Sequence, residues 1–167
     1  DLPGTLHLAL LASPHAHARI RHIDATAAAR LPGVALVLTH ENTPSLRFTT
    51  AGQGYPEPSP YDARMFDPKV RFVGDRVAAV AAESSALARE ALGLIAVDYE
   101  VLEPVLDPEA VVAGTAPAIH PGGNVLRHQR ILCGDASVTG DVVVEGTYEI
   151  GMQDQAFLGT EAALAIP

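Results

Sequence analysis

Apolar and polar positions alternate over much of the first hundred residues, with short interruptions that mark turns. Within residues 5–12, Leu6, Leu8 and Leu10 fall on one face of an extended segment, because strand side chains point to alternate sides. A second alternating segment covers residues 16–23. Aliphatic, β-branched residues over 34–38 predict a buried strand.

Two stretches rich in helix formers lie between these strands. Asp24 is a good N-cap for a helix over residues 25–31. The Ser84–Ser85 pair offers a cap for a second helix over 86–95, which carries an apolar stripe. Gly93 inside this helix predicts close packing against another element, since glycine there costs about 1 kcal/mol relative to alanine.

The remaining elements complete an order that indicates the fold class. Residues 69–73 and 76–81 flank Gly74-Asp75, which is typical of a hairpin turn, and 96–100 is the next strand. Residues 41–68 form a long irregular insertion rich in proline. The order β-β-α-β-loop-β-β-α-β predicts an α+β (mixed α/β) fold, and not the alternating order of dinucleotide-binding folds.

The pattern changes after residue 104. Residues 107–122 resemble a linker, whereas 124–132 and 141–150 look like strands of a second unit. An apolar strand over Ala162–Ile166 has no evident partner, and such edges favour self-association. We therefore expect a first domain over 1–113, a linker over 114–123 and a truncated second domain over 124–167.

Composition narrows the classes of function. The 167 residues carry a formal net charge of −9, which opposes binding to nucleic acids and gives no basis for a membrane partner. The single cysteine, Cys133, excludes an internal disulfide and favours a reduced, cytoplasmic setting. No apolar run is long enough to span a bilayer. Because the chain begins at Asp1 and stops within a pattern, we expect it to be a piece of a longer protein.

Two histidines offer a candidate metal site. In an extended strand His15 and His17 share a face, and a third ligand from His7, His22 or His40 would complete a zinc or copper site. No spacing favours these donors. A solvated or hydrogen-bonded role on a strand is therefore the stronger interpretation, and no metal ligand is assigned.

Other catalytic signatures are weak. As a nucleophile, Cys133 needs a base and an orienting group, and its position at a predicted strand end is more typical of a small core or edge residue. The sequence contains neither a glycine-rich phosphate loop nor a G-x-S-x-G elbow. Composition and spacing leave the chain without a complete active site.

Polar side chains gather around an apolar turn late in the chain. Gln153, Gln155 and Glu161 flank a turn that contains Phe157. Amides and carboxylates at the end of a strand can line a pocket, and the alternative is a solvated loop rim. These four residues are the candidates for a wall of a substrate channel.

Three separated blocks carry a resemblance to a known family. They read LLASPHAHARI at 10–20, VRFVGDRVAAVAAES at 70–84 and AVDYEVLEPV at 96–105. In this order they resemble the α/β-hammerhead domain that opens the molybdenum-cofactor subunit of the xanthine dehydrogenase and aldehyde oxidase family. Residues 142–167 resemble the start of the molybdopterin-binding domain that follows. The pattern is most similar to the stand-alone molybdenum subunit of bacterial xanthine dehydrogenases.

The last block departs from the family pattern at two positions. Family members commonly read Q-E-H-A-x-L-E-P there. In this sequence Gln155 stands at the histidine position and Gly159 at the glutamate position.

The resemblance implies a subunit that hydroxylates a purine or related heterocycle by means of a molybdenum-bound hydroxide. It implies molybdenum–molybdopterin, in the cytosine dinucleotide form, with FAD and 2Fe-2S clusters on partner domains or subunits. The family's cofactor-contacting segments and catalytic glutamate do not occur before Pro167, so no catalytic or cofactor-binding residue is assigned. We expect a docking and channel-wall part with no turnover alone. The alternative is a free-standing interaction or small-ligand-binding domain with the hammerhead fold.

Overall fold

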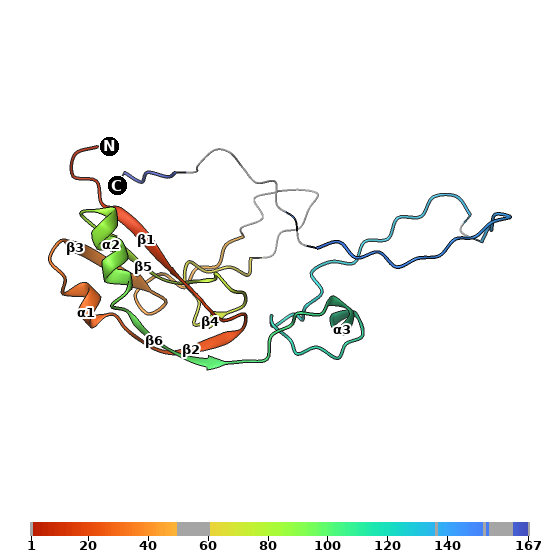
Figure 1. Ribbon diagram of the computed structural model, residues 1–167, viewed down its shortest axis with the longest axis horizontal. Coiled ribbons are helices and arrows are strands. Elements are labelled where there is room, and N and C mark those ends of the chain that lie inside the picture. The colour runs from red at the N-terminus through yellow and green to blue at the C-terminus, as the bar shows by residue number, and fades with distance from the viewer. Residues whose placement is uncertain (1, 50–60, 136, 152, 154–161, 167) are drawn as a thin grey trace. The chain divides into compact units, whose positions relative to one another are not determined.

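The computed structural model describes residues 2–49, 61–135, 137–151, 153 and 162–166 (Figure 1). The chain divides into two compact units, residues 1–128 and 129–167, which are described separately. The elements in chain order are β1 (His7–Ala12), β2 (Ala18–Asp24), α1 (Thr26–Ala29), β3 (Val34–Thr39), β4 (Lys69–Val70), β5 (Arg76–Ala82), α2 (Ser85–Leu92), β6 (Ala96–Val101) and α3 (Pro108–Val112). As far as β6 this is the order expected from the sequence, and the α+β fold class is confirmed.

The strands form two three-stranded antiparallel sheets. Sheet A has the order β1-β5-β3, and sheet B has the order β4-β2-β6. In sheet A, Ala79 at the centre pairs with Leu10 on one side and Leu38 on the other. Strands distant in sequence therefore meet in both sheets.

The hairpin predicted around Gly74-Asp75 is wrong, because its two strands belong to different sheets. Val70 is fully buried and pairs with Ala18 of β2, whereas β5 pairs with β1 and β3. The Asp75 carboxylate holds the turn between them by accepting hydrogen bonds from the backbone N–H groups of Arg71 at 3.0 Å and Arg76 at 2.9 Å. The chain thus crosses from sheet B to sheet A at this point.

Both early helices are shorter than predicted. Asp24 does accept a hydrogen bond from the Thr26 N–H at 2.9 Å, but α1 is a single turn. Ser84 caps α2 by accepting from the Leu87 N–H at 3.2 Å, as expected. Gly93 is the C-cap of α2. The prediction that it lies inside the helix and packs closely against another element is therefore wrong. The next two N–H groups bond to carbonyls three residues back, which tightens the chain and ends the helix.

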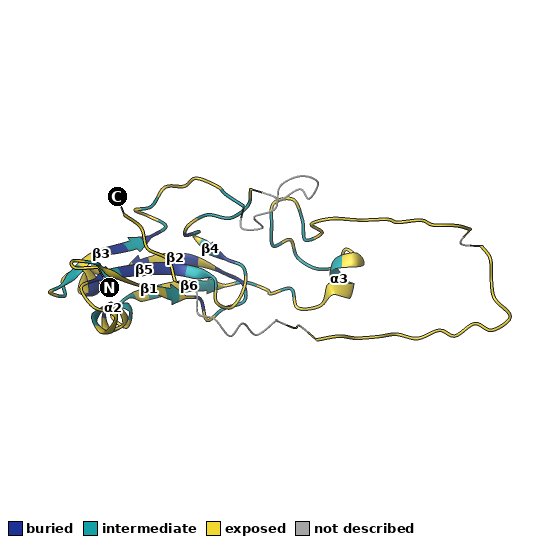
Figure 2. Cartoon of the chain, turned by 90° about the horizontal axis from the view of Figure 1, so that it is seen from above, coloured by how far each residue is buried: buried dark blue, intermediate teal, exposed yellow. Residues whose placement is uncertain are grey.

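The interior consists mainly of alanine and valine, in two clusters. The buried positions are dark blue in Figure 2. In the first, Val37, Val80 and Ala82 of sheet A pack under Ala88 and Ala91 of α2. The second comprises Ala18, Ile20, Ile23 and Val70 of sheet B together with Val77 of β5 in sheet A. Small side chains bring α2 close to the sheet, which a core with so few aromatic residues requires.

The turn before β3 shows how close this packing is. Gly33 has φ +85°, and a Cβ at this position would lie 2.8 Å from Cδ2 of Leu87 on α2. The backbone conformation therefore favours glycine, whereas the Leu87 side chain would have to shift to make room for a Cβ.

The side of sheet A that carries Leu8, Leu10 and Leu36 is only partly covered, although Ala79 on this side is 1% exposed. The strand over 34–38 was predicted to be buried, yet Leu36 is 49% exposed beside the buried Val37. Leu8 and Leu10 of β1 are 62% and 53% exposed. The prediction fails on this face because α1 and α2 pack against the opposite one.

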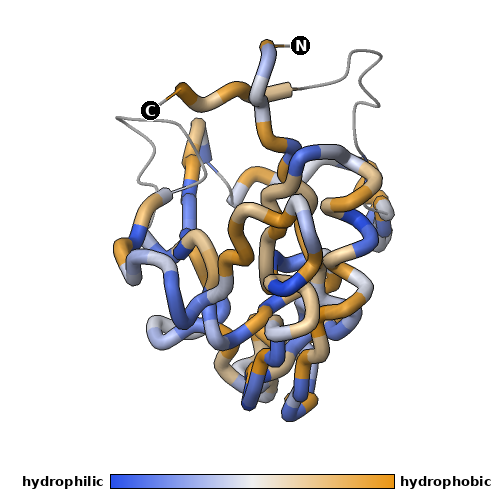
Figure 3. Tube along the Cα trace, turned by 90° about the vertical axis from the view of Figure 1, so that its left-hand side faces the viewer, coloured by the Kyte–Doolittle hydropathy of each residue, from blue (hydrophilic) through white to orange (hydrophobic). Residues whose placement is uncertain are grey.

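The part of the chain after β6 contains little regular structure. The strands predicted over 124–132 and 141–150 are wrong: no strand forms among the described residues of these ranges, which are mostly exposed. A strand is stable only when its backbone groups find a partner strand. Ala162–Ile166 is hydrophobic (near the label C in Figure 3) and exposed, as expected, but it is not in a strand.

Helix α3 falls within residues 107–122, the stretch that resembles a linker in sequence. The Asp107 carboxylate accepts from the Glu109 N–H at 2.9 Å, and Pro108 occupies the first turn. An N-cap followed by proline is a helix-start signal that the sequence contains. The predicted domain limits at 113 and 123 stay predictions.

Candidate functional site

The His15 and His17 pair does not lie on a strand. Both residues occupy the bend between β1 and β2, so the prediction that they share a strand face is wrong. His17 is buried, and its Nδ1 lies 2.6 Å from the backbone carbonyl of Glu103. A carbonyl only accepts, so Nδ1 carries the proton and donates. The His17 carbonyl in turn accepts from the Leu102 N–H at 2.9 Å. His17 therefore ties the start of β2 to the end of β6.

His15 has a different environment. Its backbone N–H donates to the Ser13 hydroxyl at 3.0 Å, and that hydroxyl donates to the His15 carbonyl at 2.9 Å. The imidazole ring packs edge-on against Tyr99, with 4.9 Å between ring centroids. Burial raises the pKa of Tyr99. Among the described residues, no group of three or more His, Cys, Asp or Glu side chains could hold a metal ion. The contacts of this bend are those of a structural turn.

A second candidate is a charged pocket of about 210 Å³ beside the turn that enters β5. Arg71 contacts the Asp67 carboxylate at 3.3 Å and donates to the Lys69 carbonyl at 3.0 Å. Arg76 donates to the Arg64 carbonyl at 3.3 Å. Positive and negative side chains alternate around this pocket, and the arginines bind the protein's own backbone. These contacts close the turn and leave no concentration of one charge for a ligand.

Lys69 extends the same network to the segment after α3. Its Nζ donates to the Ile119 carbonyl at 3.0 Å. Desolvation by burial lowers the pKa of Lys69, and the positive charges of Arg71 and Arg19 lower it further. His120 lies 3.8 Å from the Asp62 carboxylate at the rim of the pocket. The network therefore fastens residues 117–124 to the edge of sheet B.

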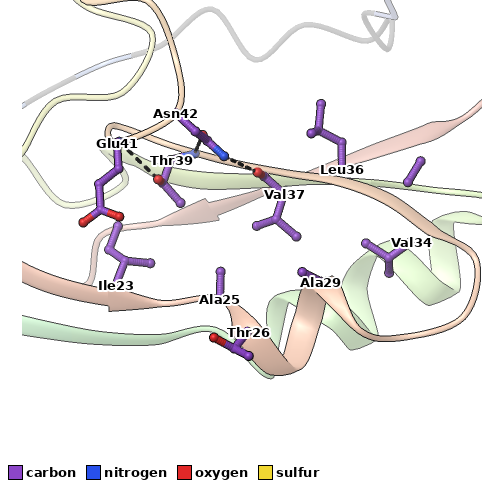
Figure 4. A pocket seen from close by; sticks show the side chains of 11 residues that line it. Ile23, Ala25, Thr26, Ala29, Val34, Leu36, Val37, Thr39, Glu41 and Asn42 are labelled. Carbon is purple, nitrogen blue, oxygen red and sulfur yellow. Dashed lines mark hydrogen bonds between the residues drawn. The ribbon is translucent and has the colours of Figure 1, made fainter.

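The third candidate is a pocket of about 440 Å³ along the free edge of β3 (Figure 4). Its polar end is formed by Thr39, Glu41 and Asn42. The Asn42 carboxamide accepts from the Thr39 N–H at 2.8 Å and donates to the Val37 carbonyl at 2.8 Å. In this way the side chain occupies the place of a neighbouring strand residue. The donor and the acceptor of the Asn42 side chain are both engaged with the backbone, so this amide is not available to a ligand.

The residues singled out late in the sequence are only partly described. Gln153 is exposed, whereas Gln155, Phe157 and Glu161 lie outside the described residues. The channel-wall assignment stays a prediction. Cys133 is exposed and lies outside any strand, so its interpretation as a core or strand-edge residue is wrong. No helix in the described part of the chain is long and apolar enough to cross a membrane.

Comparison with known proteins gives consistent matches. The model for the "Aldehyde oxidase and xanthine dehydrogenase, a/b hammerhead domain" matches residues 1–103. The "Probable hypoxanthine oxidase XdhD" of Escherichia coli (strain K12) is 56% identical over 111 residues, covering 66% of this chain and 12% of that protein. A probable xanthine dehydrogenase subunit of Bacillus subtilis (strain 168) is 35% identical over 171 residues, covering 100% of this chain and 22% of that protein.

Solved structures show the same fold. The aldehyde oxidoreductase from Desulfovibrio gigas has a TM-score of 0.64 and 36% identity, over 73% of this chain and 14% of that one. Quinoline 2-oxidoreductase from Pseudomonas putida 86 has a TM-score of 0.61 and 40% identity, over 70% of this chain and 15% of that one. The chain spans less than a quarter of the length of each of these four proteins.

Proposed function

The chain belongs to the aldehyde oxidase and xanthine dehydrogenase family, and from this premise we propose that it is the hammerhead-containing part of a molybdenum-dependent oxidoreductase of the xanthine dehydrogenase type. One observation carries the proposal: the match to the Bacillus subtilis protein extends over the whole chain and not only over residues 1–103. Both the hammerhead region and the segment after it thus agree in order with a protein named as a xanthine dehydrogenase subunit. A free-standing domain of different function has no reason to preserve both.

The described residues do not fit a molybdenum site. They contain no cluster of metal-binding side chains. Their most buried histidine, His17, donates a hydrogen bond from Nδ1 to the backbone carbonyl of Glu103. We therefore derive no chemical step from this chain. Its role in the proposed enzyme is structural: it presents surfaces to the other domains, with residues 153–161 contributing to the substrate channel wall.

The finer assignments follow from the relatives. The names hypoxanthine oxidase and xanthine dehydrogenase support a purine or related heterocycle as substrate. Relatives named as subunits, including the "6-hydroxypseudooxynicotine dehydrogenase complex subunit gamma" of Paenarthrobacter nicotinovorans, support the presence of partner subunits. We extend the proposal to FAD and 2Fe-2S clusters on these partners, as the family resemblance implies. We extend the proposal to the cytosine dinucleotide form of the pterin, to a cytoplasmic location and to the domain limits 1–113, 114–123 and 124–167.

The test uses the complete natural reading frame, expressed with any partner subunits that accompany it. We expect stoichiometric molybdenum by elemental analysis, and reduction of a dye acceptor that depends on hypoxanthine or xanthine. The 167-residue chain alone should show neither. A reading frame that stops close to Pro167, or a complete protein without molybdenum, contradicts the proposal.

A further inference from the structure

The side of sheet A that lies opposite α1 and α2 has the composition of an interior. Residues directly opposite each other in antiparallel strands share a face, so Ala81 lies between Leu8 and Leu36, and Ala79 lies between Leu10 and Leu38. All six side chains are apolar. We name this set of residues the leucine face. Antiparallel sheets that face water normally carry polar residues on that side, and apolar residues on both faces are typical of strands covered twice.

The leucine face has a defined shape. Large side chains stand on the two outer strands and alanines on the central one, and Ala79, between Leu10 and Leu38, is only 1% exposed. The two outer strands are separated by about 10 Å, twice the spacing of neighbouring strands. Leu8, Leu10 and Leu36 stay about half exposed or more in the presence of the described residues. Helices α1 and α2 cannot cover them, because both pack on the other side of the sheet.

We propose that the leucine face is the docking surface for an apolar segment of the same polypeptide, downstream of residue 167. This inference rests on the proposed function, because the downstream segment is supplied by analogy with relatives of which this chain spans only 12% and 22%. In such a protein most of the chain lies outside the part described here. A segment covalently attached to sheet A has an effective concentration that a free partner does not reach.

The size of the face favours this occupant over a second copy of the chain. Exposed fractions of 62%, 53% and 49% on three leucines amount to roughly one and a half fully exposed leucines. A stable interface between free proteins buries about 800 Å² on each partner, which is several times more. A face this small is sufficient only where the partner is already tethered. The net charge of −9 also opposes an anionic lipid surface.

Thiol accessibility in the complete protein tests the proposal. Single cysteines are introduced as Leu8→Cys and Leu36→Cys on the leucine face, with Arg21→Cys as the matched control. Arg21 lies on a strand of sheet B, and its side chain is comparably exposed at 57%. The labelling rate with N-ethylmaleimide is measured for each peptide by mass spectrometry, in the native protein and in urea.

We expect Leu8→Cys and Leu36→Cys to react about 100-fold more slowly in the native protein than in urea, and Arg21→Cys to be slowed less than about 10-fold. Equal native rates at all three positions overturn the proposal. Protection that disappears on dilution also overturns it, because the cover is then a second copy.

Molybdenum content, measured on the same preparation, separates this result from the proposed function. Protected thiols in Leu8→Cys and Leu36→Cys, in a long polypeptide without molybdenum, support the docking surface and contradict the function. Molybdenum together with freely reacting thiols at these positions supports the function and contradicts the docking surface.

Discussion

Sheets A and B have the same number of strands and the same antiparallel pairing, yet they relate to water differently. Sheet B alternates: Ile20 pairs with Tyr99 on the packed side, whereas Arg19 pairs with Glu100 on the other. Arg21 adds an ion pair with Glu100. The outward face of sheet A carries only leucine and alanine. A charged outer face indicates a sheet that is exposed to water on that side. An apolar outer face indicates a sheet that is covered there by a further layer of protein.

The largest effect is expected on the covered side of sheet A. Val80 is fully buried in the central strand β5, under the alanines of α2. Val80→Asp places an unpaired carboxylate there, and we expect a loss of about 4 kcal/mol in the free energy of unfolding. The measurement is urea denaturation followed by circular dichroism. Val101→Asp is the control, since Val101 is 62% exposed in sheet B and should lose less than about 1 kcal/mol. Equal losses would mean that the two sites do not differ in burial.

Sheet B should depend on the His17 hydrogen bond. His17→Ala leaves the Glu103 carbonyl without its donor and removes a buried ring, so we expect a loss of about 2 kcal/mol. His17→Asn keeps a donor near the position of Nδ1 and should recover part of this stability. His17→Gln, whose amide reaches the Nε2 position, should not. If the three variants unfold at the same urea concentration, the bond to Glu103 contributes nothing.

Alkaline pH should weaken the packed side of sheet B. Burial raises the pKa of Tyr99 above its ordinary value of 10.0, so the folded state holds this proton more tightly than the unfolded state. The stabilisation is fully present below pH 10 and is lost as the pH rises through the raised pKa. Tyr99→Phe should flatten the alkaline decline in thermal stability, whereas Tyr61→Phe, at an exposed side chain, should not. An unchanged decline in Tyr99→Phe would assign it to other groups.

The smallest effect is expected on the charged face of sheet B. Arg21 and Glu100 form their ion pair with side chains 57% and 40% exposed. Exposed pairs contribute little, so a double-mutant cycle with Arg21→Ala and Glu100→Ala should give a coupling of about 0.5 kcal/mol, reduced further in 1 M salt. A coupling several times larger would show that this face is shielded from water, and the contrast with sheet A would disappear.

Local signals predicted the elements well. The Ser84 cap, the start of α2 and the strands of sheet A follow from side-chain periodicity and capping residues, which act within a few positions along the chain. The exact limits were less accurate: α2 ends at Leu92 and not at residue 95, because the 3₁₀-type turn after it depends on how the chain enters β6. Helix α3 was missed although its cap was visible.

The candidate site was less accessible to sequence reasoning. The spacing of His15 and His17 was interpreted through strand geometry, but the N–H of Leu102 and the carbonyl of Glu103 are needed to see that His17 closes a bend. The hairpin at Gly74-Asp75 failed for the same reason, since its turn residues are those of a hairpin and only the partners of Val70 show otherwise. Neither the relevant carbonyl nor the partner strand lies near these residues in the sequence.

By itself, the sequence determined the kinds and the order of the elements as far as β6, the family and the alternation that separates the two sheets. Only the tertiary structure decided which strands share a sheet, that α2 covers one side of sheet A, and that the leucine face is the side left open. The physical reason is the distance along the chain over which each interaction acts. Periodicity and capping are satisfied by neighbours along the chain, whereas strand pairing and burial are satisfied by backbone groups and side chains that folding brings together from distant positions.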